Sequence, residues 1–359
     1  MLKNNKVAVI LFNLGGPDKL ESVKPFLFNL FNDKAIIGLP QPLRFLLAKL
    51  ISSRRNKKAQ KIYQQIGGKS PLLNITLAQG YSLERELSFY GDYKVFTIMR
   101  YWHPFASEVI ENIKEYHPRQ IILIPLYPQF SSSTTQSSID DFMKNFDNKE
   151  NCNIKIVCCY PEDDEFIKSH AILIKKTSEQ LSSEELSKTR LLFSAHGLPQ
   201  RTIDNGDPYV FQVNKTAHKV IQYLGNMVKK NVEDIDYRIC YQSKVGPMQW
   251  TSPSLEHEVN KAAIDKKNVI VIPIAFVSDH SETLVELDIE YKEIAHNLGI
   301  KKYFRVPSLN VEGHFIKSLA DISRAVVENN ENTMFSGQKP YRLCPKNFKL
   351  CPNKNSCQI

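Results

Sequence analysis

Short, nearly uninterrupted apolar runs recur along this chain, and they narrow the fold classes open to it. Runs of this length that end in glycine or polar residues are typical of strands buried on both faces, as in parallel sheets covered by helices. One series occupies residues 6–13, 93–99, 120–126 and 153–159, and a second occupies 190–194, 238–241, 268–274 and 303–306. The sequence therefore predicts an α/β protein with parallel sheets.

Two stretches of the first series have counterparts in the second. LFNLGGP at 11–17 corresponds to LFSAHGLP at 192–199, and the stretch at 121–138 corresponds to that at 269–286. We therefore expect two similar doubly wound, Rossmann-like halves, each a parallel sheet flanked by helices, with a cleft between their carboxyl edges. The predicted boundaries are 1–160 and 161–335, followed by a cysteine-containing tail at 336–359.

Size and charge restrict the class of protein. The 359 residues, 42% of them hydrophobic, suffice for one large or two medium domains with real cores. The chain opens MLKNNK and holds no run of eighteen apolar residues, so we expect no signal peptide, no spanning helix and a cytoplasmic location. The net charge of +9 favours an acidic substrate or anionic lipid, because no nucleic-acid-binding motif is present.

An acidic stripe follows the strand at 268–274. Glu282, Glu286 and Glu290 recur every four residues, so on an α-helix they form one stripe roughly 80° wide. Apolar residues flank this stripe on both sides: Leu284, Leu287 and Tyr291 on one, Val285 and Ile289 on the other. Like charges among apolar neighbours need a cation or a proton to compensate them, which suits metal delivery or proton removal. The alternative is a surface helix with chance spacing of glutamates.

His196 is a candidate catalytic residue of the second half. It follows the strand at 190–194 and precedes Gly197, so its ring has room to face the predicted cleft. A neutral imidazole near pH 7 can accept a proton or bind a metal ion. The alternative is a structural histidine at the end of a strand.

Two stretches of the first half suggest contacts with a ligand or a membrane. Residues 36–50 are apolar but interrupted by Pro40 and Pro42, and a basic segment follows at 52–58. This pattern suits an interfacial membrane contact, the mouth of an apolar pocket, or a core helix with a solvated basic end. Arg100 lies among aromatic residues after the strand at 93–99, where it suits a flat, acidic ligand.

Seven cysteines make a disulfide framework improbable in a chain of this length. Four lie in or beside predicted strands, where buried thiols are usual, and Cys344, Cys351 and Cys357 lie in the basic tail.

Seven motifs of the chain resemble those of one family, the ferrochelatases, which insert Fe²⁺ into a porphyrin. They are LFNLGGPD, IGGKSPL, MRYWHP, YPQFSSSTTQSS, LLFSAHGLPQR, YQSKVGPMQW and FVSDHSETLVELDIEY, and they span residues 11–291. The resemblance implies a chelatase-like fold and, as the reaction, insertion of ferrous iron into protoporphyrin IX with release of two protons. A chelatase for coproporphyrin or cobalt and a non-catalytic porphyrin or haem carrier are the alternatives.

The resemblance also implies roles for single residues. His196 and Glu282 would face the porphyrin from opposite sides and share metal binding and proton removal, with neither assigned to one task. Asp279, His280, Glu286 and Glu290 would continue the metal or proton path. Six residues match porphyrin-binding or pocket positions: Arg54, Arg55, Tyr63, Arg100, Tyr101 and Trp250. Leu14 would also bind the substrate, at a place in the pocket wall where some relatives carry a methionine.

Cofactor and membrane partners are implied in the same way. Fe²⁺ would be a substrate, and residues 36–58 would form a peripheral contact with the inner membrane. Many relatives bind a [2Fe–2S] cluster through one mid-chain cysteine and three near the C-terminus. Cys344, Cys351 and Cys357 supply three, with unusual spacing, but Ser132 stands at the mid-chain position of animal-type relatives. Cys158 or Cys159 would serve only if the fold brings it near the tail; otherwise the tail would be disordered or bind zinc.

Overall fold

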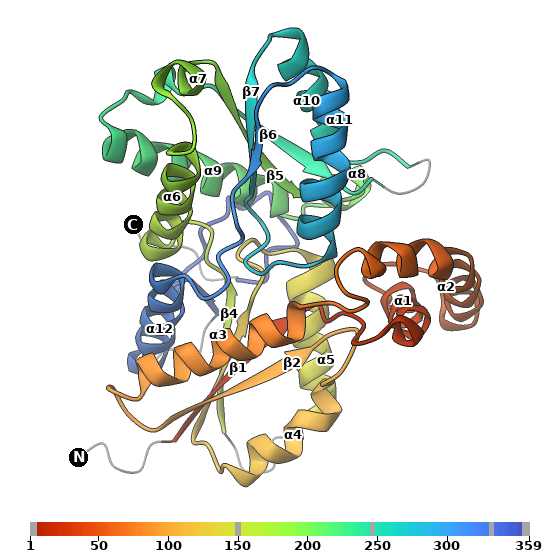
Figure 1. The fold of residues 1–359 in the computed structure, drawn as a ribbon. Coiled ribbons are helices and arrows are strands. Elements are labelled where there is room, and N and C mark those ends of the chain that lie inside the picture. The colour runs from red at the N-terminus through yellow and green to blue at the C-terminus, as the bar shows by residue number, and fades with distance from the viewer. Residues whose placement is uncertain (1–5, 148–151, 245–247, 330–333, 354–359) are drawn as a thin grey trace. The chain divides into compact units, whose positions relative to one another are not determined.

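The computed structural model describes residues 6–147, 152–244, 248–329 and 334–353, which form two compact units (Figure 1). The first takes in the described residues of Met1–Cys159, Leu319–Leu343 and Pro352–Ile359. The second takes in those of Tyr160–Ser318 and Cys344–Cys351.

The first unit is built on a five-stranded parallel sheet in the order β2-β1-β3-β4-β9. The strands are β1 (Val7–Asn13), β2 (Tyr93–Met99), β3 (Gln120–Pro125), β4 (Asn153–Cys159) and β9 (Met334–Ser336). Its helices are α1 (Val23–Phe31), α2 (Gln41–Gln64), α3 (Leu72–Leu87), α4 (Ala106–Glu115) and α5 (Ser137–Asn145). Every residue of β1 is buried, as expected of a central strand covered on both faces.

The second unit repeats this plan with a four-stranded parallel sheet in the order β6-β5-β7-β8. Its strands are β5 (Thr189–His196), β6 (Tyr237–Gln242), β7 (Asn268–Pro273) and β8 (Tyr303–Arg305). Its helices are α6 (Asp164–Ser178), α7 (Ser183–Ser187), α8 (Gln200–Asp204), α9 (Tyr209–Val228), α10 (Leu255–Ile264) and α11 (Tyr291–Asn297). The helix α12 (Gly313–Glu328) begins in this unit and continues into the first.

The predicted fold class is confirmed, with two parallel sheets flanked by helices. The first four strands of each series take the same spatial order, since β1, β2, β3 and β4 correspond to β5, β6, β7 and β8. All eight predicted strands are present, with ends that differ by a residue or two. The sequence did not predict β9, which has only three residues and adds to the edge of the first sheet beside β4.

The end of the chain divides differently from the predicted boundaries of 161–335 and 336–359. Residues Leu319–Leu343 belong with the first unit because β9 pairs with β4 and because Nζ of Lys155 donates a 2.9 Å hydrogen bond to the carbonyl oxygen of Val326. Part of the predicted tail packs in the second unit, where the rings of Phe211 and Phe348 lie 5.1 Å apart.

The acidic stretch differs from its predicted α-helical form. Residues Glu282–Glu290 form a π-helix, η4, in which the amide of Tyr291 bonds to the carbonyl oxygen of Glu286 five residues earlier. A second π-helix, η2 (Ser132–Gln136), stands at the corresponding place of the first unit, after β3. Because π-helices are rare and often mark functional sites, both counterpart stretches are of interest for function.

The apolar segment at 36–50 is exposed and leads into α2, which begins at Gln41 with a proline in its first turn. Among its exposed side chains, Leu43 and Leu46 are 58% and 63% accessible. The interpretation of this segment as a core helix is therefore wrong. Within the described ranges, no helix has both the length and the apolar character needed to cross a bilayer.

Candidate active site

His196 is the last residue of β5, and Gly197 follows it. The amide of Gly197 bonds to the carbonyl oxygen of Gln242 at 2.9 Å, and a Cβ atom at Gly197 would lie 3.0 Å from the same oxygen. Glycine therefore lets β5 and β6 stay close at this edge of the sheet while the His196 side chain projects beyond it.

Glu282 is the first residue of η4, which follows β7. Its Oε2 atom lies 2.9 Å from Nδ1 of His196, with the two side chains 27% and 36% exposed. Because a carboxylate only accepts, Nδ1 of His196 carries the hydrogen, and Nε2 of the neutral ring is its proton acceptor.

The direct contact corrects one implication of the resemblance. His196 and Glu282 were expected to face a porphyrin from opposite sides, but a 2.9 Å separation leaves no room for a macrocycle between them. The reason is topological, since β5 and β7 are neighbours in one parallel sheet and present their carboxyl ends at the same edge. The two groups therefore act from one side.

A chain of hydrogen bonds ties Glu286 to the same strand ends. Ser243 Oγ donates to Glu286 Oε2 at 2.7 Å, and its amide donates to Glu286 Oε1 at 3.2 Å. Gln242 Nε2 lies 3.3 Å from Glu286 Oε2, and Gln242 Oε1 accepts from Ser194 Oγ at 2.7 Å. Since Ser243 Oγ also lies 3.3 Å from Glu282 Oε2, one hydroxyl links both carboxylates.

The close charges shift the titration of these groups. Burial alone would lower the pKa of His196, but the negative charge of Glu282 and the hydrogen bond to it outweigh burial and raise that pKa. Burial would raise the pKa of Glu282, yet His196 outweighs it and lowers that pKa. Burial and the charge of Glu282 together raise the pKa of Glu286 to about 7. One carboxylate is thus held ionised beside a second that exchanges its proton near neutral pH.

The residues predicted to continue the path lie in three different settings. His280 is 8% exposed, lies 4.0 Å from the Glu282 carboxylate, and has a pKa lowered by burial. Asp279 faces away toward Arg305, to which it is bound at 2.8 Å. Glu290 is exposed at the far end of η4. The structure therefore brings His196, Glu282, Glu286 and His280 together but not Asp279 or Glu290.

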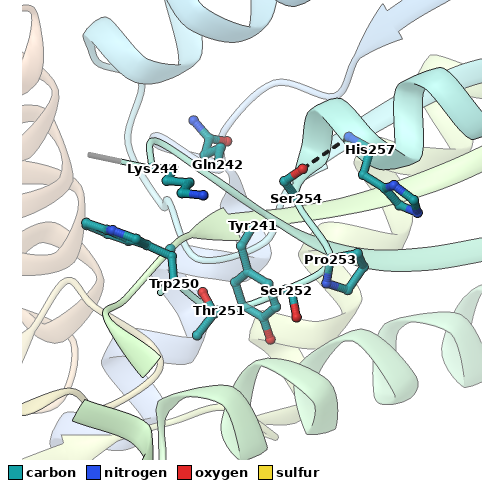
Figure 2. A pocket seen from close by; sticks show the side chains of 10 residues that line it. Tyr241, Gln242, Lys244, Trp250, Thr251, Ser252, Pro253, Ser254 and His257 are labelled. Atoms are coloured by element: carbon teal, nitrogen blue, oxygen red, sulfur yellow. Dashed lines mark hydrogen bonds between the residues drawn. The ribbon is translucent and has the colours of Figure 1, made fainter. Parts of the chain in front are cut away.

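Trp250 lies beside a cavity of about 500 Å³ in the second unit (Figure 2). The cavity is lined by Gly197, Tyr241, Gln242, Lys244, Trp250, Thr251, Ser252, Pro253, Ser254 and His257. Trp250 pairs with Pro199, and its ring is 3.3 Å from where a Cβ of Gly197 would stand. The predicted pocket residue Trp250 therefore packs against the turn that follows His196.

The sequence did not predict Gln242 and Ser243 as site residues, although both lie in the motif YQSKVGPMQW. Their position could have indicated them, because β6 is the parallel neighbour of β5 and ends at the same edge of the sheet.

The pocket residues predicted in the first unit fall into two groups. Tyr63 and Tyr101 are buried in an apolar cluster against which Leu14 packs. Arg54 and Arg55 are exposed on α2, and the guanidinium of Arg55 lies 5.6 Å from the centre of the Phe31 ring.

The guanidinium group of Arg100 was predicted to bind a ligand carboxylate, and in the structure it is paired with the carboxylate of Asp33. Arg100 forms a 2.9 Å ion pair with Asp33, and Tyr101 donates to the same carboxylate at 2.8 Å. Ser137, the first residue of α5, also donates to Asp33. The predicted ligand contacts of Arg100 and Tyr101 stay predictions, because both side chains already have partners within the unit.

Cys344 and Cys351 are buried, and Gln212 Nε2 lies 3.1 Å from Sγ of Cys344. Cys357 lies outside the described residues. Near β9, Asn353 donates to the carbonyl oxygen of Met334 at 2.7 Å, and Sγ of Cys158 lies 3.7 Å from the Ser336 hydroxyl. The described residues contain no group of three or more His, Cys, Asp or Glu side chains that could hold a metal ion.

Solved chelatases share this fold. The sirohydrochlorin chelatase SirB from Bacillus subtilis subspecies spizizenii, in complex with cobalt, superimposes with a TM-score of 0.51 over 91% of this chain and 97% of its own, at 11% identity. SirB from Bacillus subtilis with Fe³⁺ gives a TM-score of 0.53 over 90% of this chain and 96% of its own, also at 11% identity. At this identity the likeness establishes the fold alone.

Curated relatives have a much higher sequence identity to this chain. The ferrochelatase from Rickettsia bellii is 50% identical over 353 residues, which cover 98% of this chain and 96% of the relative. The ferrochelatase from Pelagibacter ubique is 46% identical over 357 residues, with 98% and 99% covered. The family model named Ferrochelatase matches residues 6–326, a span that includes the His196–Glu282 pair. The chain therefore belongs to the ferrochelatase family.

Proposed function

We propose that this chain inserts ferrous iron into protoporphyrin IX, forming protohaem and releasing the two pyrrole protons. The observation that carries the proposal is the hydrogen-bonded pair of His196 and Glu282 with Glu286 linked to it through Ser243. Membership of the ferrochelatase family supports it.

The reaction needs a proton acceptor, and the pair supplies one. With Nδ1 of His196 donating to Glu282, Nε2 is the atom that takes a pyrrole proton, and the carboxylate stabilises the imidazolium that results. Glu286 exchanges its proton near pH 7, so it is suited to receive a proton from His196 and pass it on.

The reaction also needs a metal ion brought close without being trapped. Imidazole and carboxylate are suitable ligands for Fe²⁺, and two neighbouring carboxylates attract a dication. Fe²⁺ is a substrate here, so it must leave the protein ligands for the porphyrin nitrogens. His196 and Glu282 fit a transient site, and Glu286 fits the approach to it. Since Nε2 of His196 cannot hold the ion and take a proton at once, the two carboxylates hold the ion while His196 accepts the pyrrole proton.

The alternative of a non-catalytic porphyrin or haem carrier explains the pair less well. A carrier uses an apolar site and at most one axial ligand, and it gains nothing from two carboxylates sharing a hydroxyl. Burying like charges is costly, and the raised pKa of Glu286 is a sign of that cost. The arrangement is suited to moving protons or metal ions.

Residues 36–58 support a peripheral membrane contact of this chain. Exposed apolar side chains gather at 36–50, among them Leu43 and Leu46, and the exposed Arg54 and Arg55 follow on α2. Apolar insertion beside cationic groups is the combination that binds anionic membrane surfaces. An enzyme that binds a membrane favours the more apolar protoporphyrin over coproporphyrin, which carries two more carboxylates.

No step of the proposed reaction is assigned to a [2Fe–2S] cluster. Such a cluster needs four ligands; of the three predicted in the tail, Cys344 and Cys351 are described and Cys357 lies outside the described residues. An absorption spectrum of anaerobically purified protein tests for it directly.

An insertion assay tests the proposed function. Fe²⁺ and Co²⁺ are each supplied under anaerobic conditions with protoporphyrin IX and with coproporphyrin, and turnover is followed by absorbance. We expect fastest turnover for Fe²⁺ with protoporphyrin IX. Faster turnover with coproporphyrin or Co²⁺ would replace the substrate assignment, and tight porphyrin binding without turnover would support the carrier.

A further inference from the structure

One arginine is bound to η4 from β8, the neighbour of β7 on the edge away from β5. Arg305, the last residue of β8, places Nε and NH2 each 2.8 Å from a different oxygen of Asp288. Its NH1 atom lies 2.8 Å from Oδ1 of Asp279. We name these three residues the Arg305 network.

The network fixes the chain on both sides of Glu282. Asp279 lies three residues before Glu282, and Asp288 lies six residues after it within η4. Asp279 also accepts from Asn310 Nδ2 at 2.8 Å and from Thr283 Oγ1 at 3.0 Å. Since Thr283 directly follows Glu282, the contacts of Asp279 reach the residue next to the catalytic carboxylate.

Asp279 already has three hydrogen-bond partners, which distinguishes it from a residue that binds a passing metal ion. Its side chain is 13% exposed, and the positive charge of Arg305 and hydrogen bonds outweigh burial and lower its pKa. Binding a metal ion would require Asp279 to give up these partners, with Arg305 only 9% exposed and then short of one counter-charge. Its contacts suit it to hold η4 in place.

We expect a nine-residue π-helix such as η4 to need such contacts, because π-helices are rare and mostly last a single turn. Slipping by one residue would rotate each side chain about the helix axis and shift it along that axis, by about 100° and about 1.5 Å in an α-helix and by somewhat less in the wider π-helix. Either change would separate Glu282 from His196. The fork of Arg305 requires Asp279 and Asp288 at fixed positions, so it selects one register.

We propose that Arg305 is a positioning residue that, through Asp279 and Asp288, holds η4 in the register that sets Glu282 against His196. The expected effect on the insertion rate rests on the proposed function, whereas the expected effect on the register of η4 rests on geometry alone. Lysine is a poor replacement at this position, because an ammonium group cannot make the planar two-pronged contact with Asp288.

The kinetic test is a double-mutant cycle of Arg305→Lys with Glu282→Gln. Single-turnover insertion of Fe²⁺ into protoporphyrin IX is measured anaerobically with enzyme in excess. We expect Arg305→Lys to lower the rate by about tenfold with little change in porphyrin binding. In the Glu282→Gln background it should have no further effect, because the group it positions is gone. An equal loss in both backgrounds would overturn the proposal.

Arg190→Lys is the matched control. Arg190 is as buried as Arg305 and is likewise bound to two aspartates, Asp236 at 3.0 Å and Asp265 at 2.9 Å, but at the start of β5, the strand end opposite His196. It should lower the melting temperature while leaving the rate within about twofold. A loss of rate equal to that of Arg305→Lys would show a general effect of stability and overturn the proposal.

Hydrogen exchange separates failure of this inference from failure of the proposed function. If the wild-type protein inserts no metal, the proposed function fails, and the amides of residues 281–291 still test the network. Faster exchange there in Arg305→Lys or Asp288→Asn, but not in Arg190→Lys, supports it. Unchanged exchange in both network variants contradicts it.

Discussion

Nδ1 of His196 donates a 2.9 Å hydrogen bond to Oε2 of Glu282, which joins the end of β5 to the helix that follows the neighbouring strand β7. The parallel pairing of β5 with β7 makes the contact possible, and the π-helix η4 presents Glu282 at its first position. The chemistry of the site thus depends on the meeting of a strand end and a helix start.

Replacing His196 by glutamine should remove the proton acceptor while keeping a polar side chain of similar size. We expect the rate of metal insertion to fall by about 10²- to 10⁴-fold, the usual contribution of a general base. Steady-state turnover with Fe²⁺ checks this. His218→Gln is the control, because His218 is exposed on α9 and bonds to the carbonyl oxygen of Asn214 in the same helix. Equal activity of the two variants would exclude His196 as the acceptor.

The pH dependence of turnover should follow the shifted groups. The charge of Glu282 raises the pKa of His196 above its usual value, and the pKa of Glu286 is raised to about 7, so Glu286 loses its proton as the pH passes through about 7 and His196 loses its proton at a higher pH than a free imidazole would. Neutral His196 accepts a proton and ionised Glu286 attracts Fe²⁺, so each deprotonation should raise kcat/KM. We expect kcat/KM for Fe²⁺ to rise from pH 6 to pH 8.

Glu286→Gln provides the control for that profile. It should lower kcat/KM most above pH 7 and make the rise shallower, because one of two ionisations is removed. Because the pKa of Glu286 is raised in the folded protein, its ionisation lowers the stability of the folded state as the pH rises to about 7. Relative to the wild-type protein, Glu286→Gln should therefore be more stabilised at pH 8 than at pH 5. A profile that falls between pH 6 and pH 8 would contradict the assignment.

The exposed apolar segment should determine membrane binding. Changing Leu43 and Leu46 to glutamate removes two exposed leucines and adds repulsion from anionic lipid, at a cost of about 1.5–3 kcal/mol for each lost insertion. We expect at least tenfold weaker binding to vesicles of phosphatidylethanolamine and phosphatidylglycerol in a sedimentation assay. Phe89→Glu is the control, because Phe89 is 80% exposed but lies outside residues 36–58. Equal weakening by both changes would argue against a specific contact.

The strands could be predicted because their signal is local. A buried parallel strand needs an uninterrupted apolar run, and β1 and β7 are such runs. β9 could not be predicted, because Met334–Ser336 stands in no apolar run and its place depends on pairing with β4. The return of α12 and β9 to the first unit is set by contacts such as Lys155 with Val326, which are far apart in sequence.

The candidate site was predictable only in part. His196 and Glu282 stand in distinctive motifs, and the spacing of the glutamates singled out their stretch. That spacing fits an α-helix and a π-helix alike, so it did not reveal η4. The ion pairs of Asp279 and Arg100 could not be predicted either, because their partners, Arg305 and Asp33, come from distant parts of the sequence.

The most direct test of the central claim is the Glu282→Gln variant, assayed for anaerobic insertion of Fe²⁺ and, separately, for porphyrin binding by fluorescence. We expect turnover to fall by about 10²-fold or more while the Kd for protoporphyrin IX changes little. Turnover close to that of the wild-type protein would contradict the claim that the His196–Glu282 pair carries out the reaction.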